Sequence, residues 1–374
     1  MNISLKLLIE NAYILFICVS LFFHVLNHVE IGAGIKAFQL FSVVAAILSM
    51  IVSRHDKSHL KIYLSIILFF TVLSSALSIY EESLKDAFAL VILIIGTYSL
   101  KNIKISKIFL ALNLFLPVVL LALLVNAITE PTYRYQGFYN DPNYLCTTLL
   151  LFTYILFCSI KIFSNRFALI FLFLELILVI FLASLTLSRT GIFCISLLFL
   201  VQIISNFKKY PLRFVFLFCL SVSICFYYFS DFINQQGMLL HERIFEKNDN
   251  MTSAGELRGA ISMQGVKHVL SNPIDLVFGI GIGASGHQES ITKRVSYHRD
   301  HNTITSCFTE QGFFSFLFFL IFQYKIIRFL LGAKANNKIF KFSAFFSLLI
   351  FSLSIWQMVY LPYWFLLFLL INNE

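Results

Sequence analysis

The sequence predicts an all-α membrane protein that crosses the bilayer many times. Hydrophobic residues make up 59% of the 374-residue chain, charged residues make up only 13%, and Phe alone contributes 44 positions. A soluble domain carries about 25% charged residues, so roughly half of the usual solvating charge is missing. This composition excludes a soluble enzyme, a disordered chain and a nucleic-acid-binding protein.

The individual membrane spans follow from the apolar runs. A helix that crosses a bilayer needs about 20 predominantly apolar residues. Such runs lie at 7–26, 31–52, 62–80, 84–100, 108–128, 143–163, 167–187, 190–207, 212–231 and 305–324. The last stretch, 342–372, is interrupted at Pro362, so it forms two short segments or one kinked helix. We therefore expect 11–12 transmembrane helices. Residues 1–231 would hold helices one to nine, 232–301 one long loop, and 302–374 the remaining helices.

The loops alternate in charge, and this sets the orientation. Every second loop is basic, and together with the N-terminus these loops hold 17 of the 28 basic residues: Lys6, Arg54, Lys57, Lys61, Lys101, Lys104, Lys107, Lys161, Arg166, Lys208, Lys209, Arg213, Lys325, Arg328, Lys334, Lys338 and Lys341. The opposite short loops carry the acids Glu81, Glu82, Asp86, Glu130 and Asp141. Because cytoplasmic loops are enriched in Lys and Arg, the N-terminus is expected in the cytoplasm and loop 232–301 outside.

The long outer loop has internal structure of its own. Ser253 and Glu256 have capping-box spacing, which predicts a helix that ends at Asn272-Pro273. The segment 279–286 contains a literal GxGxxG pattern. A dinucleotide-binding site would need a βαβ unit around this pattern, so we expect only a tightly turning backbone here.

Two short segments beside the outer membrane surface carry candidate binding residues. The first, 133–144, includes Arg134, Asp141 and Asn143. Asp141 could simply cap a helix that starts at Pro142, and Arg134 could contact lipid headgroups. The second segment is the short turn Ser188-Arg189-Thr190-Gly191. A charge at this depth is functional by default, although Arg189 could also extend towards lipid phosphates.

A third segment closes the long loop. His301 and Asn302 stand directly before the tenth span, and Glu310 lies two turns further on. His301 is a candidate general base, because an imidazole titrates near neutral pH. His298, Asp300 and His301 have no metal-specific spacing, and the seven cysteines form no CxxC pair. We therefore expect neither a metal nor a cofactor.

These segments, in this order, resemble the O-antigen polymerase and ligase superfamily (Wzy-like and WaaL-like proteins). The resemblance is carried by Gly137-Phe-Tyr-Asn-Asp-Pro-Asn-Tyr144, Ser188-Arg-Thr-Gly191, Arg258 with the later Gly279-Ile-Gly281, and His301-Asn302 with Glu310-Gln-Gly312. It implies a metal-independent glycosyltransferase of the bacterial inner membrane that uses undecaprenyl-diphosphate-linked oligosaccharides. An O-antigen polymerase is the expected member.

The resemblance also implies roles for the residues. Arg189 and Arg258 would bind the diphosphate leaving group, with Arg134 as a further contact, and His301 would orient or deprotonate the acceptor hydroxyl. Asp141, Asn143, Asn302 and Glu310 would complete the substrate site. Further partners would be the lipid bilayer, a chain-length regulator and a flippase, but no nucleic acid.

Two alternatives remain open. One is an O-antigen ligase, which transfers finished glycan to lipid A–core by the same donor chemistry. The other is a flippase for the lipid-linked unit. Glu175, near the middle of the seventh span, would suit a proton-coupled transporter or a structural polar contact. A transporter would more often show internal repeats with broken helices, and none is apparent.

Overall fold

The structure is a computed structural model. It describes residues 3–26, 30–32, 35–53, 58–78, 80, 82–132, 134–163, 165–206, 262–286, 302–332 and 338–372. Within these ranges the chain is almost entirely helical, as its sequence predicts. The first helices are α1 (Ile3–Val25), α2 (Ala37–Val52), α3 (His59–Leu77), α4 (Ser83–Tyr98), α5 (Ile105–Thr129), α6 (Pro142–Ile162), α7 (Arg166–Leu185) and α8 (Arg189–Asn206). After them come α12 (Pro273–Phe278), α13 (Thr303–Gly332), α14 (Lys338–Ser354) and α15 (Leu361–Leu370).

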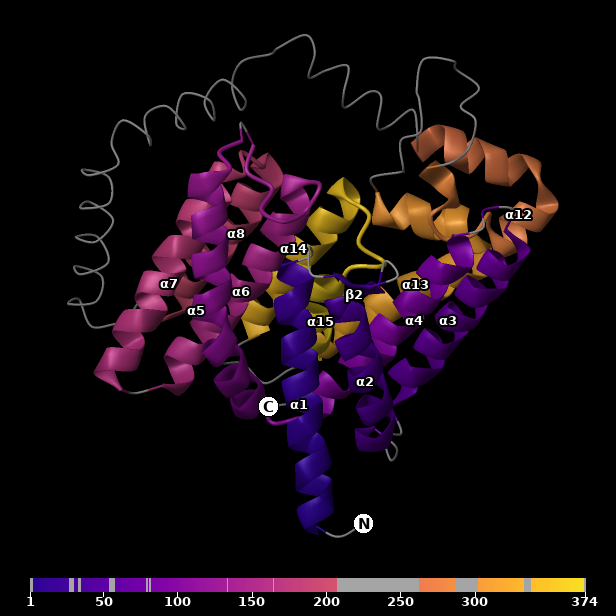
Figure 1. Cartoon of the computed structure of the whole chain (residues 1–374). Coiled ribbons are helices and arrows are strands. Elements are labelled where there is room, and N and C mark those ends of the chain that lie inside the picture. The colour runs from indigo at the N-terminus through magenta and orange to yellow at the C-terminus, as the bar shows by residue number, and fades with distance from the viewer. Residues whose placement is uncertain are drawn as a thin grey trace.

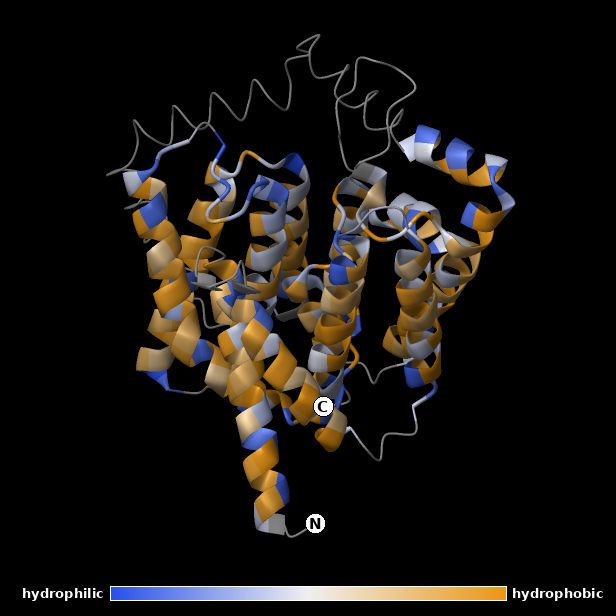
Figure 2. Ribbon diagram, turned by 45° about the vertical axis from the view of Figure 1, so that its right-hand side comes forward, coloured by the Kyte–Doolittle hydropathy of each residue, from blue (hydrophilic) through white to orange (hydrophobic). Residues whose placement is uncertain are grey.

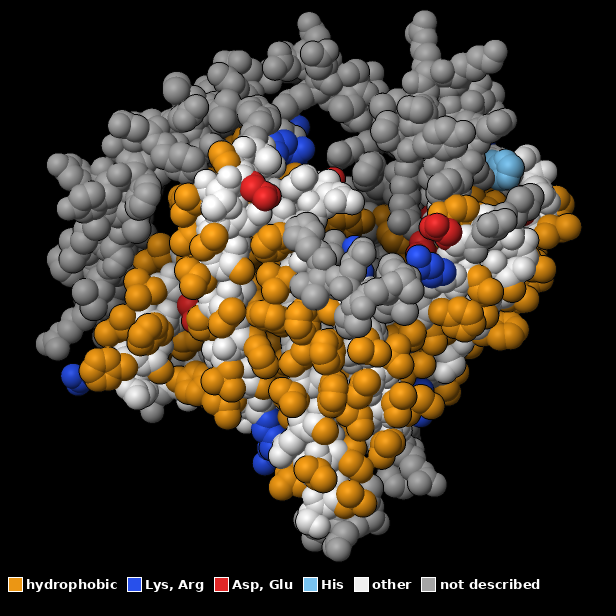
Figure 3. Space-filling model, viewed as in Figure 1, with side chains coloured by type: hydrophobic (Ala, Val, Ile, Leu, Met, Phe, Trp, Pro, Cys, Tyr) orange, Lys and Arg blue, Asp and Glu red, His pale blue; other side chains and the backbone are white. Residues whose placement is uncertain are grey.

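Seven of the described helices are long and apolar enough to cross a membrane: α1, α3, α4, α5, α6, α7 and α13. Helices α2, α8 and α15 are also apolar but contain shorter apolar stretches, of 10 to 17 residues. Hydrophobic residues run along the middle of the helices and cover most of the face drawn in Figure 3, whereas hydrophilic residues gather towards the helix ends (Figures 2 and 3). The polytopic all-α membrane fold is thus confirmed. The predicted span 212–231 lies outside the described residues.

The second predicted span starts later than hydropathy suggested. Two short antiparallel strands, β1 (Glu30–Gly32) and β2 (Ile35–Lys36), occupy its beginning, and α2 follows from Ala37. Glycines at 32 and 34 disfavour a helix there, because Gly loses more backbone entropy than any other residue. Hydropathy alone does not include this entropic cost, so it places the start of the helix too early.

The helices form two groups, and α15 packs against both of them, against α6 on one side and α4 on the other. The α5–α8 group lies on one side in Figure 1 and the α3, α4 and α13 group on the other. Of the seven long apolar helices α6 is the most enclosed, with 83% of its most apolar stretch buried, and it packs against α5, α7, α8, α14 and α15. Helix α6 therefore forms the interior of the α5–α8 group.

The C-terminal stretch forms two segments. Helix α14 ends at Ser354, a short connection follows, and Pro362 stands in the first turn of α15. Pro is tolerated in a first helical turn because its missing N–H has no intrahelical partner there. Of the two predicted forms of this stretch, the structure therefore has the two separate helices and not the single kinked one.

Helix α13 is kinked at Gly312, whose φ of 80° and ψ of 173° are not helical. The backbone of Gly279 crosses the kink so closely that a Cβ on Gly279 would lie 2.4 Å from the carbonyl oxygen of Glu310, and a Cβ on Gly312 would lie 2.4 Å from that of Val277. Only glycine combines a positive φ with so close an approach. The glycine-rich segment therefore serves to dock the end of the long loop against α13.

The described end of the long loop contains the short helices that were expected. Residues 262–271 are helical, and Asn272 then caps α12 through a hydrogen bond that its side chain accepts from Ile274 N. The predicted helix end at Asn272-Pro273 is thus confirmed. The predicted start, at Ser253 and Glu256, lies outside the described residues.

Candidate functional site

The site begins at the first turn of α6. The side chain of Asp141 accepts a hydrogen bond of 2.7 Å from the backbone N–H of Asn143, and Pro142 occupies the first helical position. Both features satisfy or remove donors that a helix N-terminus leaves unpaired. Asp141 therefore has the capping role that the sequence offered as the simpler interpretation.

The turn between α7 and α8 presents Arg189. Leu187 has a φ of 49°, which is rare for a residue with a branched side chain, and its side chain is fully buried. The turn is held by Thr186, whose hydroxyl donates to Ala183 O at 2.7 Å and accepts from Ser188 N at 3.1 Å. Arg189 follows as the first residue of α8, with an exposed side chain. Strained backbone of this kind persists only where neighbouring contacts fix it.

A buried hydrogen bond joins this turn to α6. The Ser188 hydroxyl donates to Asn143 Oδ1 at 2.6 Å and accepts from Gly191 N at 3.1 Å. Helix α8 approaches α6 so closely that a Cβ on Gly191 would lie 2.2 Å from the Sγ of Cys146. The two motifs, 45 residues apart, thus form one unit, and Asn143 serves as its acceptor.

The start of α13 belongs to the same unit through Gln357, a fully buried residue that the sequence analysis did not single out. Its Nε2 donates to Thr147 Oγ1 of α6 at 3.0 Å, and its backbone N–H donates to Thr303 Oγ1 at 2.9 Å. Asn302 caps α13 by accepting from Ile304 N at 2.9 Å. The described part of the third motif, from Asn302 on, is thus linked to α6 through Gln357.

Arg134 lies near the same turn. The backbone N–H of Tyr135 donates to Leu185 O at 3.0 Å, and its phenol donates to Leu123 O at 2.5 Å, which fixes the segment against α5 and α7. Arg134 itself is half-buried. Burial raises the pKa of the Tyr135 phenol, and the nearby Glu130 adds to the rise. Tyr135 is therefore a neutral hydrogen-bond donor that positions its arginine neighbour.

A buried aromatic cluster supports this arrangement from within. The Tyr139 hydroxyl lies 3.1 Å from Thr148 Oγ1 and 3.4 Å from His24 Nδ1, and Tyr360 donates to Tyr144 O at 2.6 Å. Burial raises the pKa of Tyr139 to about 12, although hydrogen bonds to Thr148 and Tyr360 oppose the rise. Neither His24 nor Tyr360 was predicted as a site residue from the sequence. A lone His inside an apolar run is the signal that could have identified the first.

Glu310 lies elsewhere, at the kink of α13. It is fully buried, and its Oε1 accepts a hydrogen bond of 2.6 Å from Ser285. Its backbone oxygen accepts from Gly281 N at 2.9 Å and from the Ser74 hydroxyl. These contacts tie the glycine-rich segment to α13 and α3.

Arg258 and His301 fall outside the described residues, so the structure places neither side chain. Among the predicted site residues that the structure describes, Asp141 and Asn143 lie at the start of α6, and Asn302 lies at the start of α13. Arg134 and Arg189 lie close to the α7–α8 turn.

This junction suits an anion. The N-termini of α6 and α8 are joined there by the bond between Ser188 and Asn143, and Gln357 links them to the start of α13. Helix N-termini carry partial positive charge. Side chains already accept from the first N–H groups of these helices, so the attraction for an anion comes from the helix ends and the arginines. The exposed Arg189 adds a full positive charge, and a guanidinium can bind phosphate oxygens through two parallel hydrogen bonds. Within the described residues, no group of three or more His, Cys, Asp or Glu side chains could hold a metal ion.

Comparison with known protein families gives a match over the second half of the chain. Residues 174–320 match the family model described as O-Antigen ligase. The matched range contains Arg189, Asn302 and Glu310, whereas Arg134, Asp141 and Asn143 precede it. No curated protein sequence matches the chain.

Proposed function

Residues 174–320 belong to the superfamily of O-antigen polymerases and ligases, and from this premise we propose that the chain is a surface-polysaccharide polymerase. The family implies glycosyl transfer during polysaccharide assembly by a multi-pass membrane protein. The finer proposal is that one undecaprenyl-diphosphate-linked glycan is extended by another at the outer face of the inner membrane.

The reaction moves a glycan between two lipid-linked molecules. The bond between the anomeric carbon and the diphosphate oxygen breaks, and the acceptor hydroxyl of the second unit forms the new glycosidic bond. The diphosphate leaves with an added negative charge, and the hydroxyl proton goes to a base. Groups that stabilise the leaving diphosphate lower the barrier, because its charge grows in the transition state.

The observation that carries the proposal is the hydrogen-bonded junction of α6, α8 and α13. It joins the N-termini of α6 and α8 beside Arg189 and links them to the start of α13 through Gln357. Tyr135 holds Arg134 near the same turn. We assign diphosphate binding to these two arginines and, by resemblance, to Arg258. His301, one residue before the Asn302 cap, is the proposed base.

The ligase alternative has one observation in its favour, since the matching model is described as O-Antigen ligase. The donor chemistry is shared, so the described site serves either acceptor. The presence of Asp141 does not distinguish a polymerase from a ligase, because Ser, Thr or Asn could cap α6 equally well. The acceptor therefore has to be identified by experiment.

Reconstitution with lipid-linked repeat units tests the proposal. We expect the wild-type protein in liposomes to convert lipid-linked single units into a ladder of lipid-linked polymer without lipid A–core. Arg189→Ala should lose the ladder, and Arg189→Lys should retain a small fraction because it keeps the charge but not the planar fork. Arg166→Ala is the matched control, an exposed arginine at the opposite end of α7. Product that forms only when lipid A–core is added would identify a ligase instead.

A further inference from the structure

The described end of the outer loop forms a helical corner at the edge of the bundle. Residues 262–271 are helical, the chain turns at Asn272, and α12 follows, packed against α13 and α3 (Figure 1). Val269 and Gly265 form the packed side of helix 262–271. Val269 is fully buried, and a Cβ on Gly265 would lie 3.3 Å from a side-chain carbon of Thr309. The corner is therefore fixed to the membrane-spanning helices through this side.

The opposite side of the corner is exposed and largely apolar. Met263, Leu270 and Ile274 are 56%, 60% and 65% exposed, and Lys267 is also exposed. With 3.6 residues per turn, positions 263, 267 and 270 fall on the side of their helix away from its packed side. Contact of this apolar surface with water is unfavourable, so the exposed side suits a partner that is partly apolar.

The charge of the corner narrows the chemistry of that partner. Asp275 of α12 is held within the corner, because its Oδ2 lies 3.3 Å from His268 Nε2 and accepts a hydrogen bond of 2.9 Å from Asn272 Nδ2. Lys267 is thus the charge that stands among the exposed apolar side chains. A partner that fits combines apolar groups with negative charge.

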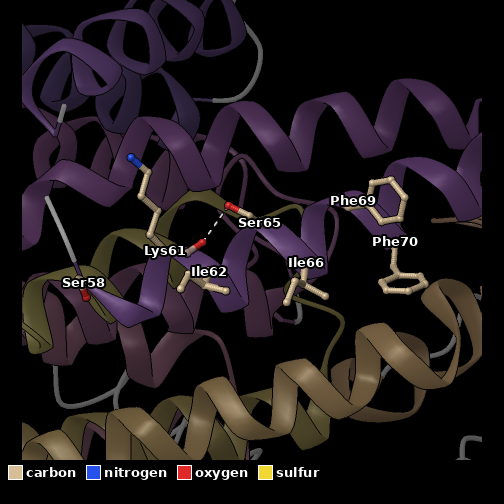
Figure 4. A pocket seen from close by; sticks show the side chains of 7 residues that line it. All are labelled: Ser58, Lys61, Ile62, Ser65, Ile66, Phe69 and Phe70. Atoms are coloured by element: carbon tan, nitrogen blue, oxygen red, sulfur yellow. Dashed lines mark hydrogen bonds between the residues drawn. The ribbon is translucent and has the colours of Figure 1, made fainter. Parts of the chain in front are cut away.

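The corner also adjoins the surface of two membrane-spanning helices. The end of α12 lies at the kink of α13, where a Cβ on Gly312 would lie 2.6 Å from the carbonyl carbon of Phe278. The next two residues of α13, Phe313 and Phe314, are exposed, and Phe314 stacks on Phe70 of the α3 face drawn in Figure 4, with ring centroids 5.4 Å apart. Exposed apolar rings on spanning helices face lipid. The apolar side of the corner therefore continues a lipid-facing surface.

We propose that this corner inserts into the outer leaflet of the bilayer. Leu270 and Ile274 enter the boundary between headgroups and acyl chains, and Lys267 binds lipid phosphates. Helices that carry apolar side chains beside Lys on an exposed side bind the membrane interface in this way. The contact holds the end of the outer loop at the membrane surface, and it does not depend on glycosyl transfer.

Tryptophan fluorescence of the full chain in liposomes tests the proposal. The liposomes contain phosphatidylglycerol and phosphatidylcholine, with or without bromine atoms on the acyl chains as quenchers. Ile274→Trp adds an indole at the corner, and the wild-type signal of the nearly buried Trp356 and Trp364 is subtracted. We expect the brominated chains to lower the added fluorescence by about half or more, as for an indole at the acyl boundary.

Thr132→Trp is the matched control, since Thr132 is an exposed residue of the connection between α5 and α6. Its added fluorescence should not respond to brominated chains. Equal quenching of the two variants, or no quenching of either, would overturn the proposal. Specific cross-linking of Ile274→Cys between two copies in the same liposomes would also overturn it, because a second copy would then cover the corner.

Charge reversal tests the headgroup contact. Lys267→Glu in the Ile274→Trp chain should reduce the quenching, because the new carboxylate is repelled by anionic lipid. The reduction should be larger in liposomes with phosphatidylglycerol than in those with phosphatidylcholine alone. Lys85→Glu, at an exposed lysine of α4, should leave the quenching unchanged. Equal effects of the two charge reversals would contradict a contact between Lys267 and lipid phosphates.

Discussion

The Ser188 hydroxyl donates a hydrogen bond to Oδ1 of Asn143 across 2.6 Å, and both side chains are buried. The bond locks the first turn of α8, with its exposed Arg189, onto the first turn of α6. Through Thr147 and Gln357 the same unit extends to the start of α13. The position of the arginine therefore depends on side chains that need not touch substrate.

The first prediction concerns this bond. Ser188→Ala and Asn143→Leu should each lower the free energy of unfolding by about 1–3 kcal/mol, because each leaves a buried polar partner unsatisfied. The double variant should lose less than the sum of the two, since both remove the same bond. Thermal unfolding in detergent measures this.

Ser184→Ala is the control for that experiment. Among the described residues, the Ser184 hydroxyl bonds only to Phe181 O within its own helix, so the loss should stay within about 0.5 kcal/mol. Fully additive effects of Ser188→Ala and Asn143→Leu would mean that the two residues act independently.

A second prediction concerns the close approach of α8 to α6. Gly191→Ala places a methyl group 2.2 Å from Cys146 Sγ, so it should destabilise the protein by about 1–3 kcal/mol. Cys146→Ala in the same chain should restore part of that loss, because it removes the nearest atom. Gly332→Ala, with nothing within 4 Å of the new Cβ, should be tolerated. Comparable unfolding temperatures for Gly191→Ala and Gly332→Ala would contradict the packing described.

A third prediction separates a structural from a chemical role for Glu310. Glu310→Gln keeps an oxygen that can accept from Ser285, so polymer yield should stay close to wild type. Glu310→Ala loses that acceptor, and the amides of Ile280 and Gly281 should exchange with solvent at least tenfold faster. Hydrogen exchange and polymer yield are measured together. If Glu310→Gln abolished polymer without a change in exchange, Glu310 would act on substrate, as the sequence first suggested.

The sequence predicted the helices well because hydropathy is a local property. The described starts of α6 and α8 fall within one residue of the predicted spans, and Pro362 marks the break between the last two helices. The cap at Asp141 could also be predicted, because an Asp-Pro pair before an apolar run is a local signal for a helix start. The two short strands before α2 were not predicted. The predicted span at 31–52 was based on apolar residues alone and took no account of the glycines at 32 and 34.

The rest depends on contacts between distant parts of the chain. Gln357 lies 210 residues from the Thr147 hydroxyl that it binds, and no pattern in either segment indicates the partner. The kink at Gly312 also lies inside an apolar run that reads as continuous helix. The backbone of Gly279 lies against this kink, and only the folded structure brings it there.

The proposed polymerase extends lipid-linked glycan. The most direct measurement is a gel of surface polysaccharide, together with the lipid-linked intermediates, from cells that lack the gene. The proposed polymerase predicts core that carries a single repeat unit, with extension restored by wild type and not by Arg189→Ala at equal membrane abundance. Bare core with long glycan still on the lipid carrier, or single units retained at the cytoplasmic face, would contradict it.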